Sequence, residues 1–142
     1  MISTVAVGTD GSATATEAVK MAAEIARRFG AELVLVSAFQ ESDARALERA
    51  GPSTELQWAS SPAARVRELL ARAEEDLRRD GIDCRQLIDE GDPAEVLARL
   101  AEECGADLLV IGNKGMERKV LGSVPNTVSH HAPCSVLIVK TT

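Results

Sequence analysis

The chain has 142 residues, of which 45% are hydrophobic, and its formal net charge at pH 7 is −6. This length provides for one buried core and is short for two ordinary domains, so we expect a single domain over residues 1–142. The acidic balance disfavours a nucleic-acid partner, because a phosphate backbone is attracted to basic surfaces.

Hydropathy argues against a membrane or secreted protein, and the cysteine spacing argues against a metal or redox site. The apolar runs are far shorter than the roughly 20 residues that a bilayer requires, and the N-terminus lacks the pattern of a signal peptide. We therefore expect a cytoplasmic protein without a membrane partner. Cys84, Cys104 and Cys134 have neither metal-site nor redox-pair spacing, which predicts reduced, buried thiols of structural purpose.

The first part of the chain predicts a strand, a helix and a second strand. Residues 2–8 are rich in β-branched side chains and end at the turn signal Asp10-Gly11-Ser12. Ser12 is a suitable cap for a helix that runs to Phe29 and stops at Gly30. Residues 31–38 form a continuous apolar run, typical of a strand covered on both faces. Residues 39–60 lose any period and predict a surface excursion, of a length that usually covers a site or is mobile.

The second part continues the alternation of helices and strands. Ser61-Pro62 begins a helix that ends at Gly81, and the more polar residues 82–89 predict a strand at the edge of the sheet. Asp92-Pro93 begins a helix that ends at Gly105. The remaining elements are a strand over 107–111, a helix over about 123–130 and a strand over 135–140.

Strict alternation predicts an α/β fold, with five strands in one parallel, doubly wound, Rossmann-like sheet between two layers of helices. Such a sheet binds ligands at the carboxyl ends of the strands where the strand order reverses. The strand order 3-2-1-4-5 would bring Asp10 and Gly112 together at that point.

A glycine-bearing loop supports a ligand site there. Gly112-Asn113-Lys114-Gly115 follows the strand over 107–111, and Gly122-Ser123-Val124 opens the next helix. Glycines allow positive φ and a close approach of the backbone to a ligand, and the first N–H groups of a helix favour an anion. The pattern resembles a phosphate cradle. Each loop also has a simpler explanation, as a turn with a helix cap or as a tight connection, but their coincidence at both switch-point loops favours a ligand.

These motifs resemble the universal stress protein family. The resemblance rests on Val7-Gly8-Thr9-Asp10-Gly11-Ser12, on Gly112-Asn113-Lys114-Gly115, on Gly122-Ser123-Val124-Pro125 and on the apolar run 132–139, and it covers the whole chain. It implies the sheet order 3-2-1-4-5, a homodimer and, in the branch that keeps the glycines, an ATP site.

Matched position by position, the resemblance implies a role for ten residues. Thr9 and Asp10 would lie against the adenosine, and backbone groups of Ser37 and Ala38 against the adenine edge. Gly112 and Asn113 would pack on the ribose side. The phosphates would be surrounded by Gly115, Gly122, Ser123 and Val124. Apart from the resemblance, the loop keeps the basic residues Lys114, Arg118 and Lys119, which could supply charge-assisted contacts to phosphate.

One departure from the family pattern concerns the loop over the phosphates. Six residues separate Gly115 from Gly122, three fewer than ATP-binding relatives usually have. A shorter ligand, a weaker affinity or a differently wrapped phosphate tail would each follow, and some relatives prefer cyclic AMP.

The sequence therefore predicts a stress-response sensor or regulator that binds ATP, with cyclic AMP or AMP as alternative ligands and Mg²⁺ accompanying ATP. Rapid phosphoryl transfer is not expected, because the chain has no Walker lysine motif and no obvious general base or magnesium-binding acid. Two further alternatives are a weak ATPase and a dimeric interaction module that has lost its ligand through the shortened loop. No metal site is predicted at His130 and His131, because no third ligand stands at metal-site spacing from them. The expected homodimer contact is the edge strand around Val136, Leu137, Ile138 and Val139.

Overall fold

The structure of the protein, a computed structural model, describes residues 1–40, 61–113 and 121–140. Its centre is one five-stranded sheet in the order β3-β2-β1-β4-β5, and every neighbouring pair of strands is parallel. The predicted fold class and strand order are thus confirmed. The strands are β1 (Thr4–Gly8), β2 (Glu32–Phe39), β3 (Cys84–Glu90), β4 (Leu108–Asn113) and β5 (Ser135–Lys140).

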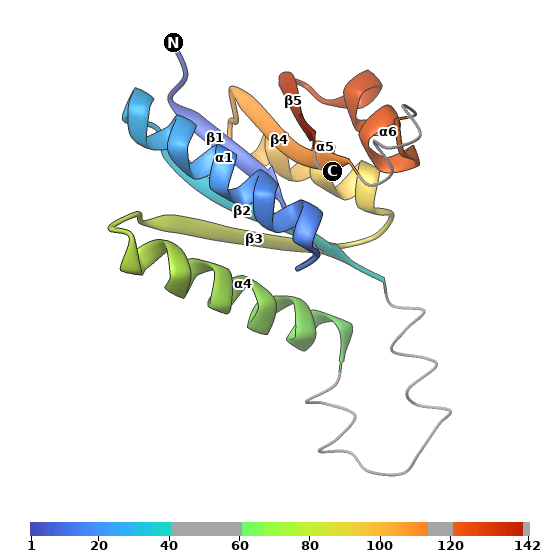
Figure 1. The fold of residues 1–142 in the computed structure, drawn as a ribbon. Coiled ribbons are helices and arrows are strands. Elements are labelled where there is room, and N and C mark those ends of the chain that lie inside the picture. The colour runs from blue at the N-terminus through green and yellow to red at the C-terminus, as the bar shows by residue number, and fades with distance from the viewer. Residues whose placement is uncertain (41–60, 114–120, 141–142) are drawn as a thin grey trace.

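Two layers of helices cover the sheet. The helices are α1 (Ala13–Phe29), α4 (Pro62–Arg79), α5 (Pro93–Glu103) and α6 (Ser123–His131). Helices α1 and α4 lie on one face, and α5 and α6 lie on the other (Figure 1). Each face has its own apolar cluster, because alternate residues of the central strands point to opposite sides. Val5 and Val7 of β1 face α1, whereas Ala6 faces α5.

The predicted caps explain where the helices begin. Ser12, Ser61 and Asp92 each accept a hydrogen bond from a backbone N–H three residues on, at 3.1, 3.1 and 3.3 Å. Gly30 ends α1 in the left-handed region at φ 64°. Among the helices that the structure describes, only α6 has no side-chain cap, since its N-cap residue is Gly122.

Several boundaries differ from the predicted ones. β1 begins at Thr4 rather than at residue 2, and β3 spans Cys84–Glu90 rather than 82–89. β4 continues two residues beyond the predicted end, because Gly112 pairs with Val139 and Asn113 with Lys140 of β5. An apolar pattern cannot reveal this extension, since the pairing supplies the backbone hydrogen bonds. The predicted excursion lies outside the described residues from position 41 to 60.

The cysteines are free, as expected, but they are half-buried rather than buried. Each lies at an end of an element or beside one: Cys84 begins the edge strand β3, Cys104 follows α5, and Cys134 precedes β5. Burial raises the pKa of the Cys84 thiol to about 11, and the nearby Glu74 carboxylate acts in the same direction.

Within the described part of the chain, the helices are too short or too polar to span a bilayer.

Candidate functional site

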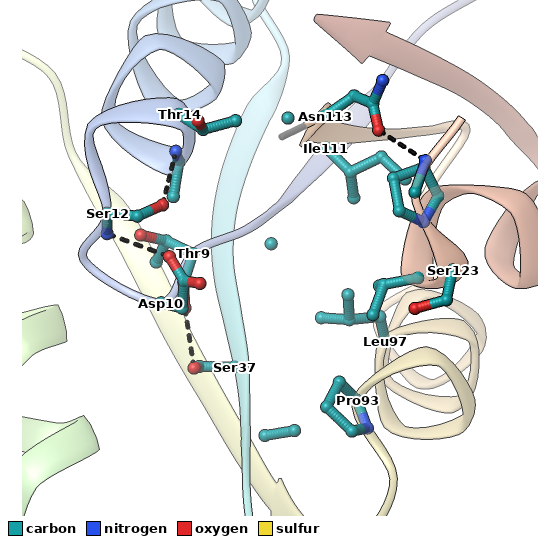
Figure 2. Close-up of a pocket in the computed structure, with 17 residues that line it drawn as sticks. Thr9, Asp10, Ser12, Thr14, Ser37, Pro93, Leu97, Ile111, Asn113 and Ser123 are labelled. Atoms are coloured by element: carbon teal, nitrogen blue, oxygen red, sulfur yellow. Dashed lines mark hydrogen bonds between the residues drawn. The ribbon is translucent and has the colours of Figure 1, made fainter. Parts of the chain in front are cut away.

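A crevice of about 360 Å³ opens at the carboxyl ends of β1 and β4, where the strand order reverses. Its walls come from the ends of β1, β2 and β4 and from the first turns of three helices (Figure 2). The lining residues are Gly8, Thr9, Asp10, Ser12, Thr14, Ala15, Ser37, Ala38, Pro93, Leu97, Ile111, Gly112, Asn113, Gly122, Ser123, Val124 and Pro125. The crevice therefore lies where a doubly wound sheet ordinarily binds its ligand.

The end of β1 is fixed to β2 by two hydrogen bonds. The Thr9 N–H donates to the Val36 carbonyl at 3.1 Å, and the Ser37 hydroxyl donates to the Thr9 carbonyl at 2.7 Å. Thr9 and Ser37 are both buried. Because these bonds hold the backbone next to Asp10, the Asp10 side chain extends from a fixed position at the end of β1.

Asp10 lies on the polar wall of the crevice and is exposed. Its Oδ1 atom accepts the Ser12 N–H at 2.9 Å, while the Ser12 hydroxyl caps α1. Both explanations of the Asp10-Gly11-Ser12 motif therefore apply, because the same residues form a turn and line the crevice. Of the lining residues that the structure describes, Asp10 alone carries a formal charge.

Gly112 is required by packing rather than by its backbone angle. A Cβ atom at this position would lie 2.5 Å from Thr14 Cγ2 and 2.7 Å from the Thr14 carbonyl oxygen. Gly112 does not have positive φ, and Gly122 has φ −62°, so the expected positive φ is wrong at both positions. The glycine at the end of β4 instead allows the first turn of α1 to approach the strand.

Asn113 links β4 to the start of α6. Its side chain is fully buried, and its Oδ1 atom accepts the Gly122 N–H at 2.8 Å. The next two residues, Ser123 and Val124, line the crevice with the first turn of α6. Their N–H groups have no intrahelical acceptor at these positions, and Pro125 has no N–H at all.

The opposite wall is apolar and was missed by the sequence analysis. Figure 2 shows Pro93, Leu97 and Ile111 on the side of the crevice facing Asp10 and Ser37. Leu97 and Ile111 are buried, and a Cβ at Gly8 would touch Leu97 at 3.2 Å. A helical period can mark Leu97 as a core position, but it cannot show that one edge of the side chain borders a cavity.

The structure brings together nine of the eleven predicted site residues, all of them in the lining of the crevice: Thr9, Asp10, Ser37, Ala38, Gly112, Asn113, Gly122, Ser123 and Val124. Gly115 and Arg118 lie outside the described residues. The additional lining residues are Gly8, Ser12, Thr14, Ala15, Pro93, Leu97, Ile111 and Pro125.

A parallel sheet of order 3-2-1-4-5 with a crevice at its switch point defines a Rossmann-like α/β protein. The model of the universal stress protein family matches residues 1–140. The chain belongs to the universal stress protein family.

Individual relatives agree with this assignment over nearly the full length. A universal stress protein of Mycobacterium tuberculosis strain H37Rv is 40% identical over 147 residues, which cover 98% of this chain and 97% of the relative. A crystal structure of a universal stress protein in complex with cyclic AMP is 32% identical, with a TM-score of 0.74 and coverage of 99% and 98%. An Arabidopsis thaliana family member with AMP bound has the same fold at 22% identity, with a TM-score of 0.77 and coverage of 99% and 92%.

Proposed function

We propose that the protein binds an adenine nucleotide in the crevice between the loops after β1 and β4, and that it acts in the cytoplasm as a stress-response sensor or regulator. The observation that carries the proposal is the pairing of an apolar slot and a carboxylate with a helix N-terminus in one crevice. These are the surfaces that a purine, a ribose and a phosphate require. The cyclic AMP complex of a 32% identical family member supports an adenine ligand.

In this proposal the base enters between the apolar wall and the end of β2. Pro93, Leu97 and Ile111 would pack on the purine, and backbone groups near Ser37 and Ala38 would bond its edge. A carboxylate can accept several hydrogen bonds at once, so Asp10 would bind the ribose hydroxyls while Oδ1 keeps the Ser12 N–H. Gly112 and the backbone of Asn113 would border the sugar, while the Asn113 side chain is buried.

The phosphates would lie at the first turn of α6. The Ser123 and Val124 N–H groups and the positive end of the helix dipole favour an anion there. Gly115 and Arg118 remain proposed phosphate contacts in the segment outside the described residues.

ATP with Mg²⁺ is the expected ligand, and cyclic AMP is a second candidate. Cyclic AMP is favoured by the complex of the relative and by the six-residue spacing of Gly115 and Gly122. Calorimetric titration compares the affinities for ATP, ADP, AMP and cyclic AMP. GTP serves as the control for selectivity of adenine over guanine. Mass spectrometry of nucleotide released on denaturation identifies the cellular one. Absence of binding by any adenine nucleotide at millimolar concentration would overturn the proposal and favour a dimeric interaction module without a ligand.

A regulator and a weak ATPase differ in turnover. We propose a regulator, because fast phosphoryl transfer requires a positioned base and metal-binding acids. A single-turnover assay with Mg²⁺ and labelled ATP should show little hydrolysis over minutes. Complete hydrolysis of the bound ATP within minutes would favour the weak ATPase.

An isosteric pair of variants tests the position of the nucleotide. Asp10→Asn keeps an oxygen acceptor for the Ser12 N–H but removes the charge facing the crevice. Asp107→Asn makes the same change at the amino end of the sheet, where the Asp107 carboxylate accepts the Ser3 and Thr4 N–H groups. We expect Asp10→Asn to weaken adenine nucleotide binding about tenfold, the usual effect of losing a charge-assisted bond. Asp107→Asn should leave binding unchanged, and equal effects of both would contradict the placement.

The homodimer through β5 is also part of the proposal. β5 is an edge strand of the sheet, and its Val136, Leu137 and Ile138 side chains are only half-buried. An edge strand presents unpaired backbone groups that a second copy can cover. Sedimentation should give a dimer, and Ile138→Lys should shift it toward monomer. A wild-type monomer at high concentration would contradict this contact.

A further inference from the structure

The buried side chain of Asn113, at the end of β4, bonds to Gly122, the N-cap residue of α6, which lies nine positions further along the chain. A side chain at the N-cap usually satisfies the first N–H groups of a helix, and the other described helices have Ser12, Ser61 and Asp92 in that place. Gly122 has no such side chain. The acceptor comes instead from a different element of the sheet.

This contact holds the end of β4 beside the start of α6. It also occupies the Gly122 N–H and leaves the donors of Ser123 and Val124, both lining residues, for a ligand. Pro125 adds no donor, and the Asn126 N–H bonds to the Gly122 carbonyl at 3.0 Å.

We infer that Asn113 is the positioning residue that sets α6 for the phosphate of a bound nucleotide, so that it controls phosphate affinity without contributing to binding of the nucleoside. The inference rests on the proposed function. Because Asn113 is fully buried and bonded to Gly122, it acts through the helix terminus rather than by reaching the ligand. Figure 2 shows Asn113 on the same side of the crevice as Ser123, away from Asp10.

Two substitutions separate this role from simple structural support. Asn113→Ala removes the acceptor, so α6 loses its anchor, and both thermal stability and phosphate affinity should fall. Asn113→Asp keeps the acceptor and adds a negative charge at the helix terminus, where an anion is favourable. The carboxylate introduced in that variant should stabilise the free protein relative to Asn113→Ala. It should also compete with a ligand phosphate for the same positive terminus.

The experiment measures melting temperature together with affinity for adenosine, AMP and cyclic AMP. We expect Asn113→Asp to melt above Asn113→Ala yet to bind AMP and cyclic AMP about tenfold more weakly than the wild type, and more weakly than Asn113→Ala. Adenosine affinity should change less than about twofold in both variants. The matched control Asn126→Asp puts the same charge on an exposed side chain in the first part of α6, and it leaves the bond from the Gly122 N–H to Asn113 in place. It should have a small effect on AMP and cyclic AMP affinity.

A structural role alone predicts that affinity follows stability and that adenosine is affected as strongly as AMP; that outcome would overturn the inference. So would an Asn113→Asp protein that fails to fold or melts below Asn113→Ala. These results differ from a failure of the proposed function, in which the wild type itself binds no adenine nucleotide.

Discussion

The close approach of α1 to β4 makes Gly112→Ala the substitution with the clearest structural consequence. The new Cβ would lie 2.5 Å from Thr14 Cγ2, 2.7 Å from the Thr14 carbonyl oxygen and 3.1 Å from its carbonyl carbon. A side-chain methyl can rotate away, but the two backbone atoms belong to the first turn of α1 and can move only with that turn. We expect a loss of about 1–3 kcal/mol in the free energy of unfolding, the usual cost of overpacking.

For a domain of this size, that loss corresponds to a fall in melting temperature of about 3–10 °C. Differential scanning calorimetry on the protein without nucleotide measures the effect directly. Nucleotide affinity should fall as well, because Thr14 and Gly112 pack against each other and both line the crevice, so a displacement of α1 changes its shape.

Gly8→Ala is a matched control, since Gly8 also ends a strand at the crevice. The nearest atoms to its Cβ would be side-chain methyl groups, those of Leu97 at 3.2 Å and Ile111 Cγ2 at 3.4 Å, and these side chains can adjust. The cost should stay below about 1 kcal/mol, partly offset by the backbone freedom that alanine removes from the unfolded chain. In a Gly112→Ala/Thr14→Ala double variant, the Cγ2 contact disappears and the carbonyl contact remains, so the rescue should be partial. Equal stability of Gly8→Ala and Gly112→Ala, or full rescue by Thr14→Ala, would refute this reasoning.

Two further predictions concern ionisable groups. The Ser3 and Thr4 N–H groups hold the pKa of Asp107 below its usual value of 3.8, so the native state favours the charged form. The stabilisation from Asp107 is therefore present above pH 4 and lost as the pH falls through the lowered pKa. Urea titrations should show Asp107→Asn less stable than the wild type at pH 6, by a margin that shrinks as the pH falls below 3.8. A margin that is constant with pH would contradict this sign. The pKa of the Cys84 thiol, raised to about 11 from 9.0, predicts that iodoacetamide labels it roughly hundredfold more slowly at pH 8 than an unperturbed thiol, as followed by peptide mass spectrometry. Rapid labelling of folded protein would show that Cys84 is not desolvated.

The amino-acid sequence by itself determined the order and type of the elements. Local signals sufficed for this, because a serine or aspartate cap, a proline in the first turn and a stopping glycine act within a few residues of one another. Ser12, Asp92 and Gly30 each do in the structure what their position in the sequence predicts. The strict alternation then restricted the topology, since parallel strands need right-handed crossovers. The strand order that brings Asp10 and Gly112 together was implied by the family resemblance, because several orders satisfy the crossover rule.

The tertiary structure decided the features that depend on residues distant in sequence. β4 reaches Asn113 because β5 pairs with it, and Gly112 is glycine because Thr14 of α1 lies against it. The apolar wall of Pro93, Leu97 and Ile111 was not visible in the helical period, which places a residue in the core without showing a cavity beside it. The bond from Asn113 to Gly122 spans nine positions and joins a strand to a helix cap. A sequence pattern reports the periodicity of one segment, whereas these contacts arise only when the sheet places separate segments side by side.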